Sequence, residues 1–121
     1  MATPYRVVLI TVPDRKTAEK IQNGLVERKL AACVNAVPGV SSVYRWEDKI
    51  EKTEEILLLC KTRAALTPEL AEFVRKNHPA SVPEIISLAI ETGNKPYLDW
   101  LGANTIFAKR PPSANPHLQK E

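Results

Sequence analysis

Apolar residues change their spacing several times along the chain, and each change marks a new element. Residues 5–12 are mostly apolar and β-branched, which is typical of a buried strand. Apolar side chains then recur at three- and four-residue intervals from Ala18 to Val26, which predicts an amphipathic helix. Asp14, just before this segment, is expected to cap the helix.

The next part of the chain returns to strand-like composition. Residues 31–46 predict a strand that bends or bulges at Pro38-Gly39. After a turn at Glu47-Asp48, a second strand begins at Lys49. Its first part, residues 51–55, is polar and is expected to project into water, whereas residues 56–60 are continuously apolar and are expected to lie deep inside.

A second helix is predicted from the run Thr67-Pro68-Glu69, with the Thr67 hydroxyl as its cap. His78-Pro79 should end this helix, because the residue before proline avoids helical backbone angles. Residues 84–91 then predict a fourth strand and residues 96–102 a short helix. We expect one domain over residues 1–107, and a disordered tail over residues 108–121, which contain three prolines and few apolar residues.

The resulting order, β-α-β-β-α-β with a short C-terminal helix, predicts an α+β protein of ferredoxin-like fold. Two main helices can cover only one face of a four-stranded sheet. The predicted strands are nevertheless apolar at both odd and even positions, so both faces require burial. Large exposed apolar patches are rare on soluble monomers. The pattern therefore predicts an oligomer.

The amino-acid composition and the net charge of the chain disfavour several classes of function. Hydrophobic residues make up 44% and charged residues 26%, and the net charge is +3. The basic residues are interspersed with acidic ones, which disfavours nucleic-acid binding. No apolar run is long enough to span a bilayer and no signal peptide is evident, so we expect a cytoplasmic protein without membrane insertion. The two cysteines lack Cys-x-x-Cys spacing, which disfavours a zinc ribbon or thioredoxin motif.

Six stretches together resemble the CutA divalent-cation tolerance family in order and spacing. They are VVLITVPD (7–14), RKLAACVN (28–35), VYRWEDKI (43–50), EEILLLCKT (54–62), HPASVPEI (78–85) and YLDWL (97–101). The resemblance implies a homotrimer of ferredoxin-like subunits, similar to PII signalling proteins, with a long hairpin that reaches a neighbour. It also implies tolerance of divalent cations, especially copper. No definite catalytic activity is attached to the family as a whole, and we expect a non-enzymatic protein without a nucleotide or organic cofactor.

The chain departs from the family pattern in three places. Asp48 stands at the hairpin tip where the family usually has Gly, and Ala80 follows His78-Pro79 where the family has Tyr. Some bacterial members have additional cysteines proposed to bind copper. Of these only Cys33 is matched, because Ile10 and Phe73 stand at the other positions.

These observations define two sets of candidate site residues. Cys33, His78 and Glu84 are the candidate ligands for copper or another divalent cation, because thiolate, imidazole and carboxylate are metal-binding groups. Each also has a plainer interpretation: a small core residue, a helix-ending cation and a solvated strand end. A second set is expected to line a ligand pocket or a subunit interface, where aromatic residues are common; it comprises Trp46, Lys61, Tyr97 and Trp100.

Two other functions are compatible with the predicted fold. A PII-like regulatory module would bind a small anionic metabolite between subunits, although the chain has only 4 glycines and none are clustered. A hydrolase resembling acylphosphatases would use an arginine after the first strand, and Arg15 lies there. No glycine-rich phosphate loop surrounds Arg15, which disfavours this alternative.

Overall fold

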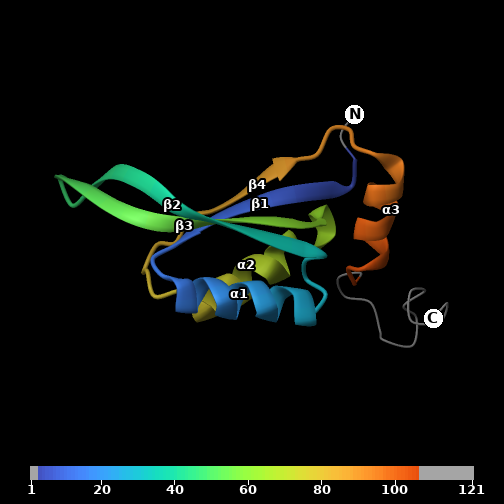
Figure 1. Ribbon diagram of the computed structural model, residues 1–121, viewed down its shortest axis with the longest axis horizontal. Helices are drawn as coiled ribbons and strands as arrows, with labels where there is room; N and C mark the ends of the chain where they lie inside the picture. The colour runs from blue at the N-terminus through green and yellow to red at the C-terminus, as the bar shows by residue number, and fades with distance from the viewer. Residues whose placement is uncertain (1–2, 107–121) are drawn as a thin grey trace.

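The computed structural model describes residues 3–106 and has an α+β architecture (Figure 1). The expected tail over residues 108–121 lies outside the described residues. The elements are β1 (Tyr5–Val12), α1 (Arg15–Glu27), β2 (Cys33–Trp46), β3 (Lys49–Arg63), a 3₁₀ turn (Ala64–Leu66), α2 (Thr67–Asn77), β4 (Ile85–Ala89) and α3 (Lys95–Ala103).

The four strands form one antiparallel sheet in the order β2-β3-β1-β4. β1 lies between β3 and β4, with Val8 opposite Cys60 on one side and Ser87 on the other. This order and the β-α-β-β-α-β connectivity confirm the predicted ferredoxin-like fold. The fourth strand is shorter than predicted, and α3 extends one residue further at each end.

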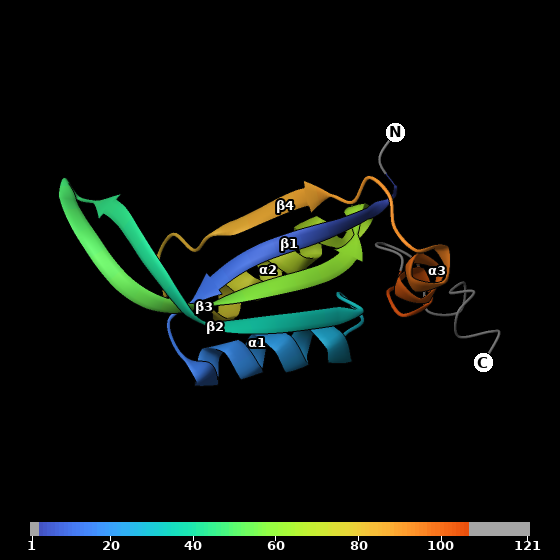
Figure 2. The same cartoon turned by 45° about the horizontal axis from the view of Figure 1, so that its top comes forward.

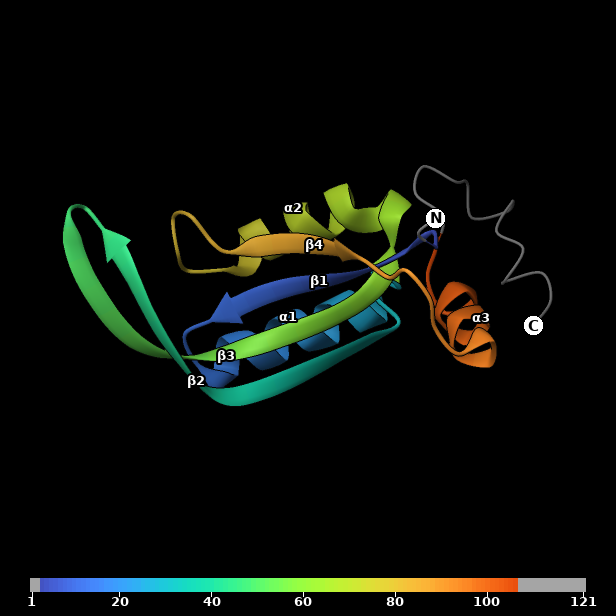
Figure 3. The same cartoon turned by 90° about the horizontal axis from the view of Figure 1, so that it is seen from above.

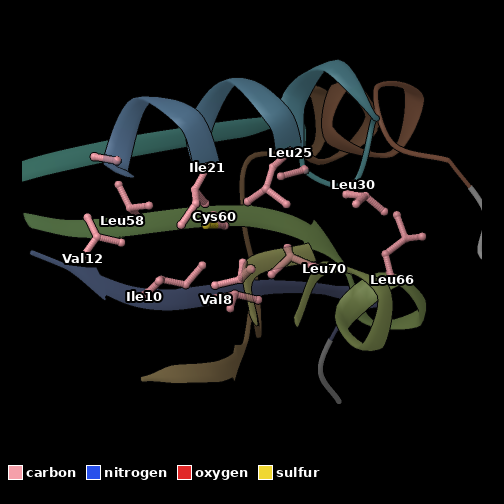
Figure 4. Close-up of a cluster of buried hydrophobic side chains, with 13 residues drawn as sticks. Val8, Ile10, Val12, Ile21, Leu25, Leu30, Leu58, Cys60, Leu66 and Leu70 are labelled. Atoms are coloured by element: carbon pink, nitrogen blue, oxygen red, sulfur yellow. The ribbon is translucent and has the colours of Figure 1, made fainter. Parts of the chain in front are cut away.

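The core lies between the sheet and helices α1 and α2, which both pack on one face (Figures 1 and 4). Alternation along the strands sends every second side chain to this face. These side chains meet apolar residues of the two helices. The buried cluster comprises Val8, Ile10, Val12, Ala18, Ile21, Leu25, Leu30, Ala31, Leu58, Cys60, Leu66, Leu70 and Val74.

The helix ends agree with the sequence predictions except at one residue. The Asp14 carboxylate caps α1 by accepting a hydrogen bond of 2.8 Å from the Thr17 amide. Thr67, in contrast, is not the cap of α2 but its first residue. The preceding 3₁₀ turn already gives Leu66 a helical backbone, and the Thr67 hydroxyl donates to the Ala64 carbonyl at 2.9 Å. His78 ends the helix in extended conformation, as predicted.

Strands β2 and β3 form a long hairpin that extends past the two helices and curves away from the sheet (Figure 2). The predicted bulge interrupts the register between Val37 and Val40, and Gly39 has a positive φ of 72° there. At the tip, Glu47 and Asp48 also have positive φ angles, of 49° and 66°. Both central residues of a two-residue type I′ turn require such angles, so the hairpin forms without the family's usual glycine.

Within the described part of the chain, no helix covers the opposite face of the sheet, and Figure 3 views the molecule from this side. We call this face the open face. Ile86 and Leu88 of β4 are 48% and 50% exposed there. Leu57 and Leu59 also point to this face, because they alternate with buried Leu58 and Cys60; the expectation that all of residues 56–60 lie deep inside is therefore right for only one side of β3. The subunit alone leaves an apolar sheet surface in contact with water.

Helices α1 and α2 approach each other closely at Gly24. A Cβ atom at this position would lie 2.3 Å from the tip of the Phe73 ring. The guanidinium of Arg28 lies 4.7 Å from the centroid of the same ring, so the ring is held between α1 and the Arg28 side chain. The absence of a side chain at Gly24 therefore sets the spacing between the two helices.

We predict that Gly24→Ala lowers the free energy of unfolding. In an open helix this change would stabilise by about 1 kcal/mol, but overpacking a tight contact typically costs about 1–3 kcal/mol. Urea unfolding should therefore show a net loss. Asn23→Ala, at the exposed neighbouring position, is the matched control. A Gly24→Ala protein as stable as this control would contradict the close-packing argument.

Candidate functional site

A cleft of about 700 Å³ lies between the β2–β3 hairpin and the loop that joins α2 to β4. We call it the hairpin cleft. The hairpin contributes aromatic, hydroxyl and acidic side chains, and the loop contributes His78 and an acidic residue. It is lined by Thr11, Ser41, Ser42, Val43, Tyr44, Trp46, Glu55, His78, Ala80, Ser81, Val82, Pro83 and Glu84.

His78 enters the cleft from the end of α2, and both of its ring nitrogens are hydrogen bonded. The Ala80 amide lies 3.0 Å from Nδ1, and the Thr11 carbonyl oxygen lies 2.7 Å from Nε2. Because an amide can only donate, Nδ1 accepts and Nε2 must carry the hydrogen. This arrangement fixes the tautomer. The ring can bind a metal only after one of these two hydrogen bonds is given up.

Two carboxylates accompany His78 in the hairpin cleft. Glu84 is exposed and precedes β4, while Glu55 projects from β3 near the base of the hairpin. Trp46, 44% exposed, contributes an indole ring from the hairpin tip. The cleft thus combines acidic and aromatic groups with an oriented imidazole, and no lysine or arginine among residues 3–106 lines it. Its charge favours a cation over an anion.

A second polar cluster occupies the open face where β2 begins and β3 ends. We call it the strand corner; it consists of Cys33, Asn35, Lys61 and Tyr97. Lys61 is the direct cross-strand partner of Cys33, and its Nζ atom lies 3.9 Å from the Cys33 Sγ. Lys61 also donates to the Asn35 side-chain oxygen. Burial raises the pKa of the Tyr97 hydroxyl, and the neighbouring Cys33 raises it further.

Helix α3 brings Tyr97 and Trp100 to this corner because Arg63 anchors the helix end. The Arg63 guanidinium donates to the Thr105 hydroxyl at 2.9 Å and to the Gly102 carbonyl at 2.6 Å. Tyr97 and Trp100 contact each other with ring centroids 5.5 Å apart. The aromatic pair therefore depends on an arginine from the end of β3.

The structure divides the seven candidate residues between two places. Trp46, His78 and Glu84 line the hairpin cleft. Cys33, Lys61 and Tyr97 form the strand corner together with Asn35, and the Trp100 ring contacts that of Tyr97. The hairpin and α3 lie at opposite ends of the molecule (Figure 1). Within residues 3–106, no three histidine, cysteine or acidic side chains come together as a metal site.

Sequence reasoning missed two residues: Asn35 of the strand corner, and Arg63, which anchors α3 beside it. Asn35 lies between apolar neighbours in β2 and has no motif of its own; only the strand register places it beside Lys61. Arg63 follows the last apolar residues of β3, and its link to α3 spans about forty residues of sequence. Pairing Cys33 with Lys61 across the two predicted strands would have revealed the first of these.

Comparison with known proteins gives the family. The model of the CutA1 divalent ion tolerance protein family matches residues 6–104. The chain belongs to this family. The divalent-cation tolerance protein CutA of Thermus thermophilus is 52% identical over 99 residues, which cover 82% of this chain and 96% of that protein. Human protein CutA is 47% identical over 92 residues, covering 76% of this chain and 51% of the human protein. The chain therefore spans about half the length of the human relative.

Solved structures of the CutA1 family have the same fold. The divalent cation tolerance protein of Thermus thermophilus superposes with a TM-score of 0.82 at 51% identity, covering 84% of this chain and 98% of that one. CutA1 from Oryza sativa superposes with a TM-score of 0.83 at 45% identity, covering 86% and 95%. Among residues 3–106, no helix has the length and apolar character needed to cross a membrane.

The second cysteine, Cys60, belongs to β3 and points into the core, on the face of the sheet opposite to the strand corner. Desolvation raises the pKa of its thiol to about 12 from 9.0. Folding therefore disfavours its ionised form. The resulting contribution to stability is complete below the unfolded pKa and is lost as the pH rises through the folded pKa.

We accordingly predict that the free energy of unfolding falls more steeply between about pH 9 and pH 12 in the parent protein than in Cys60→Ala. Chemical denaturation at closely spaced pH values measures the two slopes. Lysines and tyrosines also titrate in this window, and the comparison cancels their common effect. Parallel slopes would show that the thiol ionises as readily in the folded protein as in the unfolded one.

Proposed function

We propose that this protein is a non-enzymatic homotrimer that binds a divalent cation, with copper as the preferred candidate, and contributes to metal tolerance in the cytoplasm. Membership of the CutA1 divalent ion tolerance family supports the role in tolerance. The uncovered apolar face of the sheet carries the proposal of assembly. The separation of Cys33 from His78 and Glu84 supports the proposal that the cation binds between subunits.

The argument for assembly begins with the residues of the open face. Ile86, Leu88 and Val37 are between 42% and 50% exposed in the subunit. Burying a large aliphatic side chain contributes roughly 1.5–3 kcal/mol. Several such side chains on one continuous sheet face supply a strong drive for association. A closed ring of three subunits, as the family resemblance implies, would cover all three faces at once.

We predict that the protein has about three times its chain mass of 13.5 kDa in light scattering. Leu88→Glu should convert it to smaller species, because three like charges would be buried together against apolar surface. Val26→Glu is the matched control, since Val26 is also exposed, at 44%, but lies on α1 rather than on the open face.

A folded monomer at micromolar concentration would refute the trimer. Equal masses for the parent protein and Leu88→Glu would instead place the interface elsewhere on the molecule. Circular dichroism of both variants separates a change in assembly from a loss of folding.

The proposed metal site lies between two subunits. His78 and Glu84 share the hairpin cleft of one subunit, whereas Cys33 lies at the strand corner near the other end. One subunit therefore cannot use all three as ligands. A neighbour in the trimer can supply its Cys33 to the cleft, which would create a nitrogen, oxygen and sulfur donor set suited to copper. The acidic lining of the cleft, to which both Glu55 and Glu84 contribute, also favours a cation.

The alternative is a PII-like regulatory module that binds a small anionic metabolite between subunits. The hairpin cleft has a volume within the usual range for small-molecule sites, about 300–1,000 Å³. The part of its lining that the structure describes, however, contains two carboxylates and no lysine or arginine. An anion would need Lys61 of a neighbouring subunit. The charge of the cleft therefore favours the metal hypothesis.

We predict that isothermal titration of the full-length protein with Cu(II) shows saturable binding. His78→Ala and Cys33→Ala should each weaken it by about tenfold or more, since even groups outside the first shell of ligands can contribute that much to metal affinity. Cys60→Ala is the matched control, because Cys60 is buried in the core.

Three results would count against the metal site. Equal affinities for His78→Ala and the parent protein would remove His78 from it. Weakening by Cys33→Ala in a protein that light scattering shows to be monomeric would contradict a site between subunits. A rise in melting temperature with organic anions, but none with copper, would favour the regulatory alternative.

A further inference from the structure

The two cysteines point to opposite faces of the sheet. Cys60 lies on the buried side of β3, in alternation with Leu59 and Lys61 of the open face, and is fully buried. Cys33 is paired with Lys61, one position further along, and lies on the open face. Because successive side chains of a strand alternate between faces, the sheet itself separates the two thiols. A Cys33–Cys60 disulfide within one subunit would require the strands to be rebuilt.

The Cys33 thiol instead lies beside an amine. The Lys61 Nζ and the Cys33 Sγ are 3.9 Å apart, and they belong to directly opposed residues of a continuous antiparallel pair. The Asn35 side-chain oxygen contacts both groups and holds the amine beside the sulfur. Tyr97 closes the cluster on the α3 side. The pair is therefore aligned by the strand register and by two side chains.

We propose that Cys33 and Lys61 form a reversible covalent cross-link in which one oxygen atom bridges the Lys61 nitrogen and the Cys33 sulfur. Dioxygen is the oxidant. The sulfur and the nitrogen each lose two electrons, and dioxygen accepts all four. One oxygen atom forms the new N–O and O–S bonds. The other leaves as water with the thiol hydrogen and one amine hydrogen. The separation of 3.9 Å leaves room for one bridging atom after a small rotation of the lysine side chain.

This cross-link would act as a redox switch on the strand corner. It joins the edge strand β2 to β3 and removes both a thiol and a positive charge from the open face. A bridged sulfur is no longer a thiolate ligand, so oxidation would withdraw Cys33 from the metal site proposed above. The cross-link itself forms within one subunit. It does not depend on the metal hypothesis, and its test requires no metal.

The test is intact mass spectrometry of the full-length protein, reduced, freed of metal with a chelator, and then kept in air-saturated buffer. We expect a gain of about 14 Da, from one added oxygen and two lost hydrogens, which a thiol reductant reverses. Tryptic digestion should show that Cys33 and Lys61 peptides are joined and that cleavage after Lys61 is lost. Cys33→Ser and Lys61→Arg should both abolish the change.

Two matched controls should retain the cross-link: Cys60→Ala, which removes the other thiol, and Lys20→Arg, which replaces an exposed lysine of α1. A gain of about 32 Da without cross-linking would mean that Cys33 oxidises alone to a sulfinic acid, and this would overturn the proposal. So would a product of twice the chain mass linked through Cys33, or a gain of about 14 Da that persists in Lys61→Arg. An unchanged mass after prolonged exposure to air would equally refute it.

Discussion

A sheet that is apolar on both faces, with helices on only one, is the constraint on which the rest of this structure depends. Helices α1 and α2 bury Val8, Ile10 and their neighbours, and this one layer forms the main buried cluster of the described residues. The alternating residues, such as Leu59 and Leu88, must find cover elsewhere. Edge strands and apolar faces are liabilities unless a protein covers them. The same alternation that forms the core therefore creates the surface proposed for assembly.

The long β2–β3 hairpin then determines where the candidate site residues lie. β2 runs for 14 residues from Cys33 to Trp46. At about 3.3 Å per residue, its ends would be on the order of 40 Å apart if the strand were straight. The bulge at Gly39 bends it and turns the outer half away from the sheet. The hairpin consequently brings Trp46 to the cleft with His78 while it leaves Cys33 at the other end of the molecule.

Most of the fold could be predicted from spacing alone, because each element has a pronounced period or a clear boundary residue. Asp14 and the turn at Glu47-Asp48 are local signals with local consequences, and the structure confirms both. The prediction for Thr67 was wrong because threonine is a common helix cap. The preceding 3₁₀ turn instead sets the backbone conformation, so that Thr67 is already a helical residue. The contact between Lys61 and Asn35 depends on strand register, which composition does not specify.

The candidate site was harder to predict because the contacts that orient its residues come from parts of the chain that are distant in sequence. The orientation of His78 depends on a carbonyl from β1, distant in sequence, and no pattern around His78 indicates that both ring nitrogens are already bonded. These two hydrogen bonds affect metal binding. An imidazole with a free nitrogen would be a ready ligand, but the His78 ring would have to exchange a hydrogen bond for a metal bond. Such an exchange is favourable only where other ligands also converge on the ion. Cys33 lies away from the cleft of its own subunit. The metal site that we propose therefore takes its third donor from a neighbouring subunit, and metal binding at that site would depend on assembly.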